Sequence, residues 1–517
     1  MKKWKVMSLS LAVLMTTTML SACGPVEVAG TVSGNVNVTV DVTVEGGETQ
    51  NNNQSGGQGT QSGGSGGTNS QSGQGGSTSR PSTVNEEEVR KELEGYTFTI
   101  ASGWMTDRDD IGENTPFYER LFWERAEEIE KEYGCKIEMI RFYGRTNDMR
   151  TYIMAGKKIA DVVESMPIWI PENVAAGYLR PWSDVPDINT GDTSKWLSYT
   201  TNVSTYKGQV YGIQFMKPAE ARLCVMFNKT LLDRNGVDVN GIYDLVKNKQ
   251  WTWDKLREYA QMATKDTNND GVMDTWGIIG KYDYIANGIL SSFGGSLITQ
   301  SGGKYAYSLN SSASVAALDF YNRLVNTDKV LWVADQLYGE NSYTNLNEQT
   351  YVQRFNSGNS AFLIWDSWVL NQYTKANANF EYGILPLPLG GSMKEYVSPA
   401  HTMRTFCITS TNDDLDKVAI VMNALADNFG GYQSDADWYE DVKADYFKND
   451  ADKNMEMYEL ILNSSMIDYG LAIENLETAF NHDVVLNSIY WKKSTPSVAA
   501  DSIKNQYTDL IDNVFNK

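Results

Sequence analysis

A strand, a helix and two further strands follow one another between residues 96 and 165, and this alternation restricts the chain to few folds. YTFTIASG, residues 96–103, alternates as a strand does, and PFYERLFWERAEEIEKEYG repeats apolar residues on one helical face before Gly134. CKIEMIRFY and the short apolar ADVVES predict two more strands. The order indicates α/β layers. Further helices are predicted over 253–264, 315–325, 417–428, 456–462 and 503–515.

The first residues indicate an exported protein. Lysines at the start precede an apolar run over 6–20 that is too short to span a membrane. The run ends in LSAC, which resembles the lipobox of bacterial lipoproteins, where a peptidase cuts before the cysteine that carries the lipid. This predicts a signal peptide over 1–22 and lipidation of Cys23. An ordinary signal peptide is the alternative, and the tether-like sequence that follows favours the lipoprotein.

A low-complexity segment separates this start from the bulk of the chain. Residues 46–86 are mainly Gly, Ser, Gln, Asn and Thr, which have too little apolar surface to fold, so a disordered linker is predicted. Residues 23–45 form a lipidated N-terminal segment, in which alternating valines over 31–45 could pair as a hairpin. The remainder, 87–517, is longer than one hydrophobic core usually serves, so two lobes are expected.

Charge and rare residues exclude several classes of protein. The formal net charge of -21 repels nucleic acid and anionic lipid. Besides Cys23 there are three cysteines, an odd number that excludes a closed disulfide framework. Cys224 and Cys407 lie in apolar strand-like runs and are predicted to be core residues. With only two histidines, a histidine-rich metal centre is excluded, and a catalytic triad would have to use one of them.

Five segments, in order, resemble the carbohydrate-binding branch of the extracellular solute-binding proteins that serve ATP-driven (ABC) importers. They are YKGQVYGIQF, LCVMFNKTLLDRNGVD, WTWDKLREYAQMATKDTNNDGVMDTWGI, FNSGNSAFLIWDSW and YGILPLPLGG. The resemblance covers residues 96–515. The tyrosine- and acid-rich segment 430–468 resembles the form common in Gram-positive bacteria, where these proteins are lipid-anchored on the outer face of the cytoplasmic membrane.

The resemblance implies an α/β fold of two lobes, the type II periplasmic-binding-protein-like fold. The ligand lies in a cleft between the lobes, which close by hinge bending. Lobe 1 would comprise about 96–217 and about 390–425, and lobe 2 about 222–385 and parts of 430–517. The crossover segments would be KPAEA, 217–221, and LPLPLGG, 385–391, and hinge motion is expected beside the two prolines of the latter.

Aromatic and polar residues after the predicted strands are the candidates for ligand binding. A sugar offers apolar C–H faces and a rim of hydroxyls, so its site needs flat rings and fixed polar groups. Open α/β folds bind ligands where parallel strands end, and the resemblance implies ligand-contacting loops there. The candidates are Trp104, Asp107, Met166, Trp169, Glu220, Arg222, Tyr282, Asp283, Tyr284, Trp365, Trp368 and His401.

Each candidate also has a structural interpretation. Any single tryptophan is as readily a packing residue, so the prediction is that two of Trp104, Trp169 and Trp368 line the cleft. Glu220 and Arg222 either bond ligand hydroxyls or pair with each other, and His401 is more readily a structural histidine than a cleft residue.

The stretch DTNNDGVMDTWGI, residues 266–278, has the pattern of a calcium loop. Positions 1, 3, 5, 7 and 9 of an EF-hand-type loop are filled by Asp266, Asn268, Asp270, the Val272 carbonyl and Asp274. Gly277 stands at the twelfth position in place of the usual glutamate. A structural Ca²⁺ joining a helix to a strand is the favoured prediction. The alternative is a metal-free turn in which Asp and Asn side chains bond to the loop backbone.

The resemblance implies a solute-binding protein rather than an enzyme. It would capture a carbohydrate, preferably an oligosaccharide, by lobe closure and deliver it to the permease subunits of an ABC importer, as a monomer tethered to the membrane through its lipid, with no nucleic-acid partner. A lipid-anchored glycoside hydrolase is one alternative, since 65 acidic residues do not exclude two carboxylates about 5–10 Å apart. A calcium-dependent adhesin is the other, supported only by the single incomplete loop.

Overall fold

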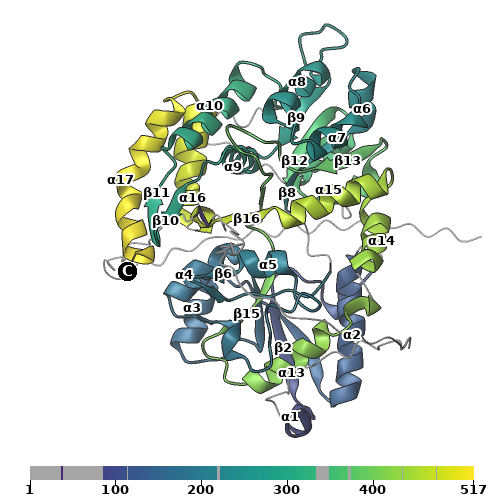
Figure 1. Cartoon of the computed structure of the whole chain (residues 1–517), viewed down its shortest axis with the longest axis vertical. Helices are drawn as coiled ribbons and strands as arrows, with labels where there is room; N and C mark the ends of the chain where they lie inside the picture. Colours follow the sequence, from purple (N-terminus) through teal and green to yellow (C-terminus); the bar gives the residue numbers. More distant parts are fainter. Residues whose placement is uncertain are drawn as a thin grey trace, which may run out of the picture.

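The computed structural model describes residues 37–38, 86–112, 115–217, 222–332, 348–370, 374–432, 435–472 and 474–516. It has two lobes placed end to end (Figure 1). The predicted signal peptide, the lipidation site Cys23, most of the segment 31–45, the linker to residue 85 and the candidate Glu220 lie outside the described residues. Among the described helices, none combines the length and the apolar character that a membrane span requires.

Lobe 1 is built on a five-stranded sheet of order β3-β2-β4-β15-β5. β2, β3 and β4 are parallel, whereas β15 runs antiparallel to both of its neighbours. The strands are β2 (Thr97–Ser102), β3 (Lys136–Arg141), β4 (Val162–Ser165), β5 (Leu179–Arg180) and β15 (Thr405–Thr409), and β6 (Thr205–Tyr206) and β7 (Gln209–Val210) form a separate hairpin. The helices are α1 (Glu86–Leu93), α2 (Phe117–Tyr133), α3 (Thr146–Met154), α4 (Ile170–Ala175), α5 (Ser198–Val203) and α13 (Leu415–Ala426).

Helix α2 shows how the local sequence specifies this lobe. Phe122, Ala126 and Ile129 recur at three- and four-residue spacing and are fully buried. The helix ends where Gly134 adopts a φ of 68°, a left-handed conformation that glycine adopts without steric cost, and the Gly134 N–H donates to the Glu130 carbonyl at 2.9 Å. The stripe and the terminating glycine therefore fix both the buried face and the length of the helix.

Lobe 2 is built on a four-stranded sheet of order β13-β8-β12-β9. Every residue of β8 and β12 is buried, as expected for strands covered on both faces. The strands are β8 (Leu223–Asn228), β9 (Trp276–Gly280), β12 (Ser360–Asp366) and β13 (Tyr382–Leu385). The helices are α6 (Lys229–Arg234), α7 (Gly241–Lys247), α8 (Trp253–Ala263), α9 (Tyr282–Ser292), α10 (Ser312–Asn326), α11 (Glu348–Asn356), α12 (Lys375–Asn377), α14 (Asp435–Tyr446), α15 (Ala451–Asn463), α16 (Glu474–Ala479), the π-helix η8 (Phe480–Tyr490) and α17 (Pro496–Phe515).

A third sheet lies where lobe 2 meets lobe 1, and Figure 1 shows its strand β16 at this boundary. Its order is β11-β10-β1-β16-β14. The strands are β1 (Asn37–Val38), β10 (Ile298–Ser301), β11 (Lys304–Tyr307), β14 (Ser398–Pro399) and β16 (Ser465–Asp468). The short helix η7 (Tyr469–Ala472) follows β16 and contacts lobe 1, where the Tyr469 hydroxyl donates to the Thr205 carbonyl at 3.3 Å.

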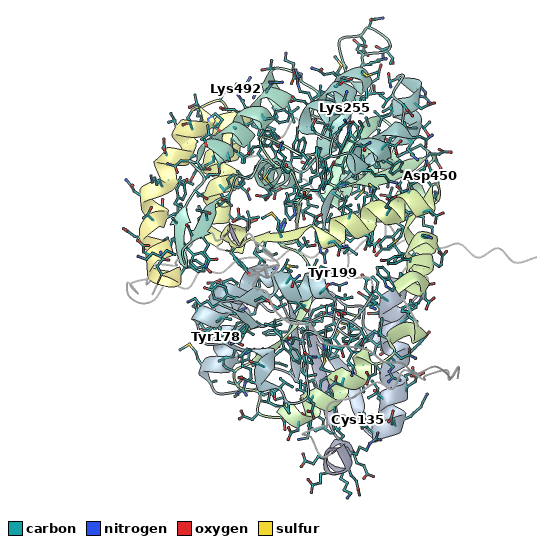
Figure 2. The ribbon with its side chains drawn as sticks, in the orientation of Figure 1. Cys135, Tyr178, Tyr199, Lys255, Asp450 and Lys492 are labelled. Carbon is teal, nitrogen blue, oxygen red and sulfur yellow. The ribbon has the colours of Figure 1, made fainter. Side chains whose placement is uncertain are left out.

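The secondary structure confirms the predicted strand, helix, strand, strand order as β2, α2, β3 and β4. Helices α8, α10, α13, α15 and α17 correspond to the five further predictions, and α15 and α17 begin several residues earlier than expected. Several further helices, among them α3, α6, α7, α11 and α14, were not predicted. Cys135, Cys224 and Cys407 are free and buried, which confirms the core prediction for the last two; Figure 2 labels Cys135 toward the far end of lobe 1.

The return of the chain to lobe 1 lies later than the sequence suggests. The segment LPLPLGG stays on lobe 2, because the indole N–H of Trp251 donates to the Pro386 carbonyl and the N–H of Leu389 donates to the Trp251 carbonyl, both at 3.0 Å. The Thr402 hydroxyl still donates to Asp366 of lobe 2, at 2.7 Å, whereas Met403 accepts a hydrogen bond from Thr200 of lobe 1. The crossing is therefore at residues 402–403 rather than beside the prolines.

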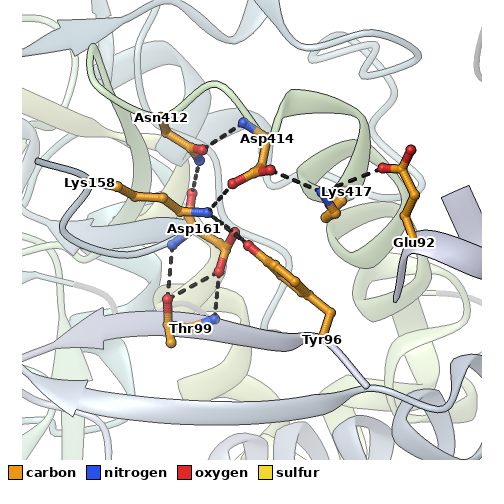
Figure 3. A network of polar contacts seen from close by, with 8 residues as sticks. All are labelled: Glu92, Tyr96, Thr99, Lys158, Asp161, Asn412, Asp414 and Lys417. Atoms are coloured by element: carbon orange, nitrogen blue, oxygen red, sulfur yellow. Dashed lines mark hydrogen bonds and ion pairs between the residues drawn. The ribbon is translucent and has the colours of Figure 1, made fainter. Parts of the chain in front are cut away.

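A polar network closes lobe 1 at the edge where its parallel strands begin (Figure 3). The Asp161 carboxylate, 1% exposed, accepts hydrogen bonds from the Thr99 backbone at 2.7 Å, the Tyr96 hydroxyl at 2.8 Å and Lys158 at 2.6 Å. Lys158 also donates to Asp414 at 2.7 Å, just before α13. Burial raises the pKa of Tyr96 to about 12, so the phenol stays a neutral donor. The network joins two strands to the start of a helix.

Asp161→Ala should therefore lower the free energy of unfolding by about 2–4 kcal/mol, because it removes one of the two carboxylate acceptors of the partly buried Lys158 ammonium group and leaves the Thr99 N–H without its acceptor. Chemical denaturation measures this. Asp413→Ala is the matched control, since the Asp413 side chain is 95% exposed and its ion pair with Arg180 is long, at 3.4 Å. Equal effects of the two substitutions would contradict a central role for the Asp161 network.

The same network makes a prediction about acid. The Lys158 ammonium, with Lys417 adding to it and burial opposing, holds the pKa of Asp414 below its ordinary value. A carboxyl whose folded pKa is depressed adds stability above its unfolded pKa, and that stability is lost as the pH falls through the folded pKa. The melting temperature of Asp414→Asn should therefore fall less than that of the parent chain between about pH 6 and about pH 3. Asp413→Asn should behave like the parent.

Candidate functional site

The two main sheets turn the same kind of edge toward each other. In lobe 1, β2, β3 and β4 end where β15 begins. In lobe 2, β9, β12 and β13 end where β8 begins. The chain enters β8 and β15 directly from the crossings between the lobes, so both edges lie at the boundary between the lobes. Ligands of open α/β folds bind at such edges.

Three rings from three neighbouring strands meet at the edge of lobe 1. Trp104 follows β2, Tyr143 follows β3, and Trp169 ends the short helix η2 (Pro167–Trp169) after β4. The indoles of Trp104 and Trp169 stack with centroids 5.8 Å apart at 25°, and Tyr143 meets Trp104 edge to face at 5.2 Å. Tyr143 is 40% exposed and both indoles are half-buried. We refer to Trp104, Tyr143 and Trp169 as the lobe 1 aromatic cluster.

Glycine and arginine complete this cluster. A Cβ atom on Gly103 would lie 2.2 Å from the Tyr143 ring, so only glycine lets the ring approach the backbone here. The exposed Arg145 guanidinium lies 5.1 Å from the Tyr143 centroid and 5.5 Å from that of Trp169. The cluster thus combines flat apolar faces with an exposed cationic donor.

Buried charges support the loop that carries Trp104. Arg404, at the chain's return to lobe 1, lies 3.3 Å from Glu119 and 3.8 Å from Glu164, both almost fully buried. Glu164 accepts from the Ser102 hydroxyl at 2.5 Å. The same hydroxyl oxygen accepts the backbone N–H of Trp104 at 3.1 Å. The position of the indole is therefore fixed through backbone bonds as well as ring contacts.

The facing edge of lobe 2 carries a second aromatic group. Tyr284, in the first turn of α9, packs on Trp365 with centroids 4.8 Å apart and on His401 at 6.0 Å. The ring of Tyr351 also contacts Trp365, with centroids 5.6 Å apart. Trp365 is fully buried, so its ring supports Tyr284 and offers no face to solvent. Trp368, after β12, is half-buried.

The remaining candidates lie around these two groups. Asp107 forms a part-exposed ion pair with Arg141 at 2.8 Å, and Met166 is half-buried directly before η2. Tyr282 and Asp283 are buried, and Asp283 pairs with Lys281 at 2.8 Å. Arg222 is also buried, at 2% exposure, ahead of β8.

His401 is held neutral at this boundary. Burial lowers its pKa to about 4; Arg222 and Lys281 add to the shift, and Asp283 opposes it. A neutral imidazole fits the structural role that the sequence favoured, although the residue also borders the edge of lobe 2.

The structure adds residues that sequence reasoning missed. Tyr143 and Arg145 follow β3 just as Trp104 follows β2. The reasoning that selected residues after β2 and β4 would therefore have found them had it been applied to β3. Arg404 and Glu119 gave no such signal, because only the fold brings the start of β15 against the first turn of α2.

The loop predicted to bind calcium closes on its own backbone. The Asp266 carboxylate accepts the N–H groups of Asn269 and Gly271 at 2.7 and 2.8 Å, and Asp274 accepts that of Thr267 at 2.7 Å. These are the contacts of the metal-free alternative.

The middle of the loop continues the pattern. Asn268 and Asp270 accept the N–H groups of Asp270 and Val272, each at 2.8 Å, and the Val272 side chain is exposed. Within the described ranges, no three His, Cys, Asp or Glu side chains gather as a metal site. In this arrangement the side-chain oxygens accept hydrogen bonds from the backbone of the loop.

Comparisons with known proteins agree with this architecture. The model of the bacterial extracellular solute-binding protein family matches residues 112–403, more than half of the chain. The fold is similar to that of the GacH receptor of Streptomyces glaucescens, crystallised unliganded and with acarbose, at a TM-score of 0.55 and 17% identity over 81% of this chain and 99% of that one.

Two further structures show the same fold. A substrate-binding protein of Listeria monocytogenes in complex with cycloalternan matches at a TM-score of 0.53 and 16% identity, over 82% of this chain and 100% of that one. UgpB of Mycobacterium tuberculosis in complex with glycerophosphocholine matches at a TM-score of 0.56 and 15% identity, over 81% of this chain and 99% of that one. The architecture is thus the two-lobed periplasmic-binding-protein-like fold with a cleft between the lobes, and the chain belongs to the bacterial extracellular solute-binding proteins.

Proposed function

We propose that this protein captures a carbohydrate, specifically an oligosaccharide, in the cleft and delivers it intact to the permease of an ABC importer. The lobe 1 aromatic cluster carries the proposal. Two stacked indoles and a phenol, partly exposed at a strand-end edge, are the surface on which the C–H face of a sugar ring packs.

Polar groups beside the cluster suit the hydroxyls of such a ligand. Arg145 is exposed above two of the rings, and the Asp107–Arg141 pair stands part-exposed on the same lobe. On lobe 2, Trp368 and Tyr284 are half-buried at the facing edge and would contact the ligand when the lobes close.

The ligand class rests on these rings more than on the fold. Two of the similar structures are named for complexes with acarbose and cycloalternan, and a third for a complex with glycerophosphocholine. One fold therefore accepts different ligands, and side chains at the edges decide among them.

Cleavage of the sugar is not favoured. A glycoside hydrolase needs two carboxyl groups that flank the ligand. Two carboxylates of this region, Glu119 and Glu164, are almost fully buried and bonded to Arg404 and Ser102, so they support the loop, and the part-exposed Asp107 is paired with Arg141. Membership of a solute-binding family supports the same conclusion.

We also propose that the mature chain is tethered at Cys23 by a lipid to the outer face of the membrane of a Gram-positive bacterium and acts as a monomer. The lipobox-like LSAC and the glycine- and serine-rich 46–86 segment support this. The linker would let the lobes reach a permease in the same membrane.

The loop from Asp266 to Asp274 is proposed to bind Ca²⁺ as a structural ion. Its support is the alternation of oxygen-bearing residues and its place between α8 and β9. Asp266, Asn268, Asp270, the Val272 carbonyl and Asp274 would be the ligands. Since the loop already folds on its own hydrogen bonds, an ion would add stability to a formed turn.

Trp169→Ala should weaken binding of an oligosaccharide about thirtyfold, because removing a central stacking ring typically costs about 2 kcal/mol. A glycan array of the mature chain selects the sugar, and calorimetry measures the affinity. Tyr152→Ala, which removes a 44% exposed ring on α3 outside the cluster, should leave affinity unchanged. Unaltered affinity in Trp169→Ala would refute the assignment, and recovery of sugar fragments by chromatography would favour the hydrolase.

Calcium should raise the melting temperature of the parent chain, and Asp270→Ala should abolish that rise while oligosaccharide affinity is kept. At a hundredfold excess over the dissociation constant, the ion would add about 2.7 kcal/mol. Asp254→Ala, which removes an 80% exposed carboxylate on α8, is the control. A melting temperature that does not respond to calcium or to a chelator would refute the proposed Ca²⁺ site.

A further inference from the structure

A second cavity lies at the boundary between the lobes, away from the aromatic cluster. It has a volume of about 240 Å³ and is lined by residues of both lobes. The β6–β7 hairpin and the end of α5 form one wall, and the β10–β11 hairpin forms the other. The lining residues used below are Asn202, Thr205, Tyr206, Lys207, Gln300 and Tyr305. We call this cavity the seam pocket.

The helix η7 stands between the seam pocket and the lobe 1 aromatic cluster. It contacts η2, which carries Trp169, while its first residue, Tyr469, packs on Tyr206 at 6.0 Å and donates to the Thr205 carbonyl. Figure 1 shows β6 beside the boundary, near β10 and β11. The pocket is therefore not an extension of the ring-lined edge.

Tyr206 lines the seam pocket with a buried side chain. The residue is 2% exposed, and its buried hydroxyl has no hydrogen-bond partner among the residues that the structure describes. Such groups are rare in folded proteins and call for an explanation. Burial, with Tyr305 adding to it, raises the pKa of Tyr206, so the phenol is neutral and can both donate and accept.

The other walls are polar but carry little charge. Asn202 from lobe 1 and Gln300 from β10 contribute amides to the lining, Thr205 adds a hydroxyl-bearing side chain, and Tyr305 adds a second buried ring. Among the described residues of the lining, Lys207 is the one cation, and its ammonium group lies 5.6 Å from the Tyr206 centroid. Amides, phenols and ring faces are the groups that recognise hydroxyls and C–H faces.

The hairpin that presents these groups has a defined turn. Lys207 and Gly208 both have positive φ angles, 48° and 76°, as the two central residues of a type I′ turn do. The lysine tolerates this conformation only because the hairpin holds it, so the wall keeps its shape.

We propose that the seam pocket is a second binding site, for a small neutral polyol such as glycerol or a single sugar. Its volume exceeds the space for a few water molecules but lies below the range of pockets that hold drug-sized ligands. The ligand would satisfy the Tyr206 hydroxyl and bond to the amides of both lobes. The site is separate from the one proposed for the oligosaccharide and does not depend on it.

Calorimetric titration of the mature chain with D-glucose and with glycerol tests the site, using Tyr206→Phe and Gln300→Ala. Each variant should bind at least about fivefold more weakly, as expected for the loss of one hydrogen bond. Because the Tyr206 hydroxyl has no hydrogen-bond partner within the described part of the chain, Tyr206→Phe should keep or raise the melting temperature.

Tyr307→Phe on β11 is the matched control. The Tyr307 hydroxyl donates to the Ala500 carbonyl at 2.5 Å, so its loss should lower the melting temperature and leave polyol binding intact. Trp169→Ala should also leave polyol binding intact, which separates this site from the cleft.

Three outcomes would overturn the proposal. One is the absence of saturable binding of either probe. Another is binding that Trp169→Ala removes and Tyr206→Phe does not. The third is binding of inorganic phosphate in place of both polyols, which would assign the pocket to an anion held by Lys207. None of these outcomes overturns the proposal for the oligosaccharide, which is tested with a different ligand.

Discussion

The ion contacts of Arg404 tie the chain's return to lobe 1 to the surface on which a ligand would rest. The guanidinium lies within 4 Å of Glu119 at the start of α2 and of Glu164 on β4. Glu164 in turn orients Ser102, whose hydroxyl oxygen holds the backbone ahead of the Trp104 ring. Two nearly buried carboxylates are stable here because the Arg404 cation, the Ser102 hydroxyl and the Thr106 N–H satisfy them. Crossing, sheet edge and aromatic cluster are thus parts of one bonded unit.

Much of the fold could be predicted because local sequence specifies it. Apolar strands such as β4 and β8 are buried along their whole length, and the stripe and final glycine of α2 set that helix. The third sheet could not be predicted, since β14 and β16 are short and pair only through contacts distant in sequence. The crossing was misplaced for a related reason: two prolines suggested a hinge, but Trp251 bonds that segment to lobe 2.

The candidate site was predictable in position and less so in detail. Residues after parallel strands could be picked from the sequence, and Trp104 and Trp169 lie together there. Exposure could not be read in the same way, because Trp365 and Trp368 are separated by two residues yet the first is fully buried and the second only half-buried. The sequence of the acidic loop is ambiguous in a similar way, since Asp and Asn at alternate positions suit both a cation and the loop's own N–H groups.

The change of lobe at Thr402 and Met403 is abrupt. One residue bonds to Asp366 and the next to Thr200, with the Met403 side chain fully buried. A pivot this short permits rotation and resists sliding, so at residues 402–403 the two lobes should rotate about a single axis. Different ligands would then be enclosed by nearly the same motion. A partner in the membrane could recognise the surface of the closed conformation whichever ligand is bound.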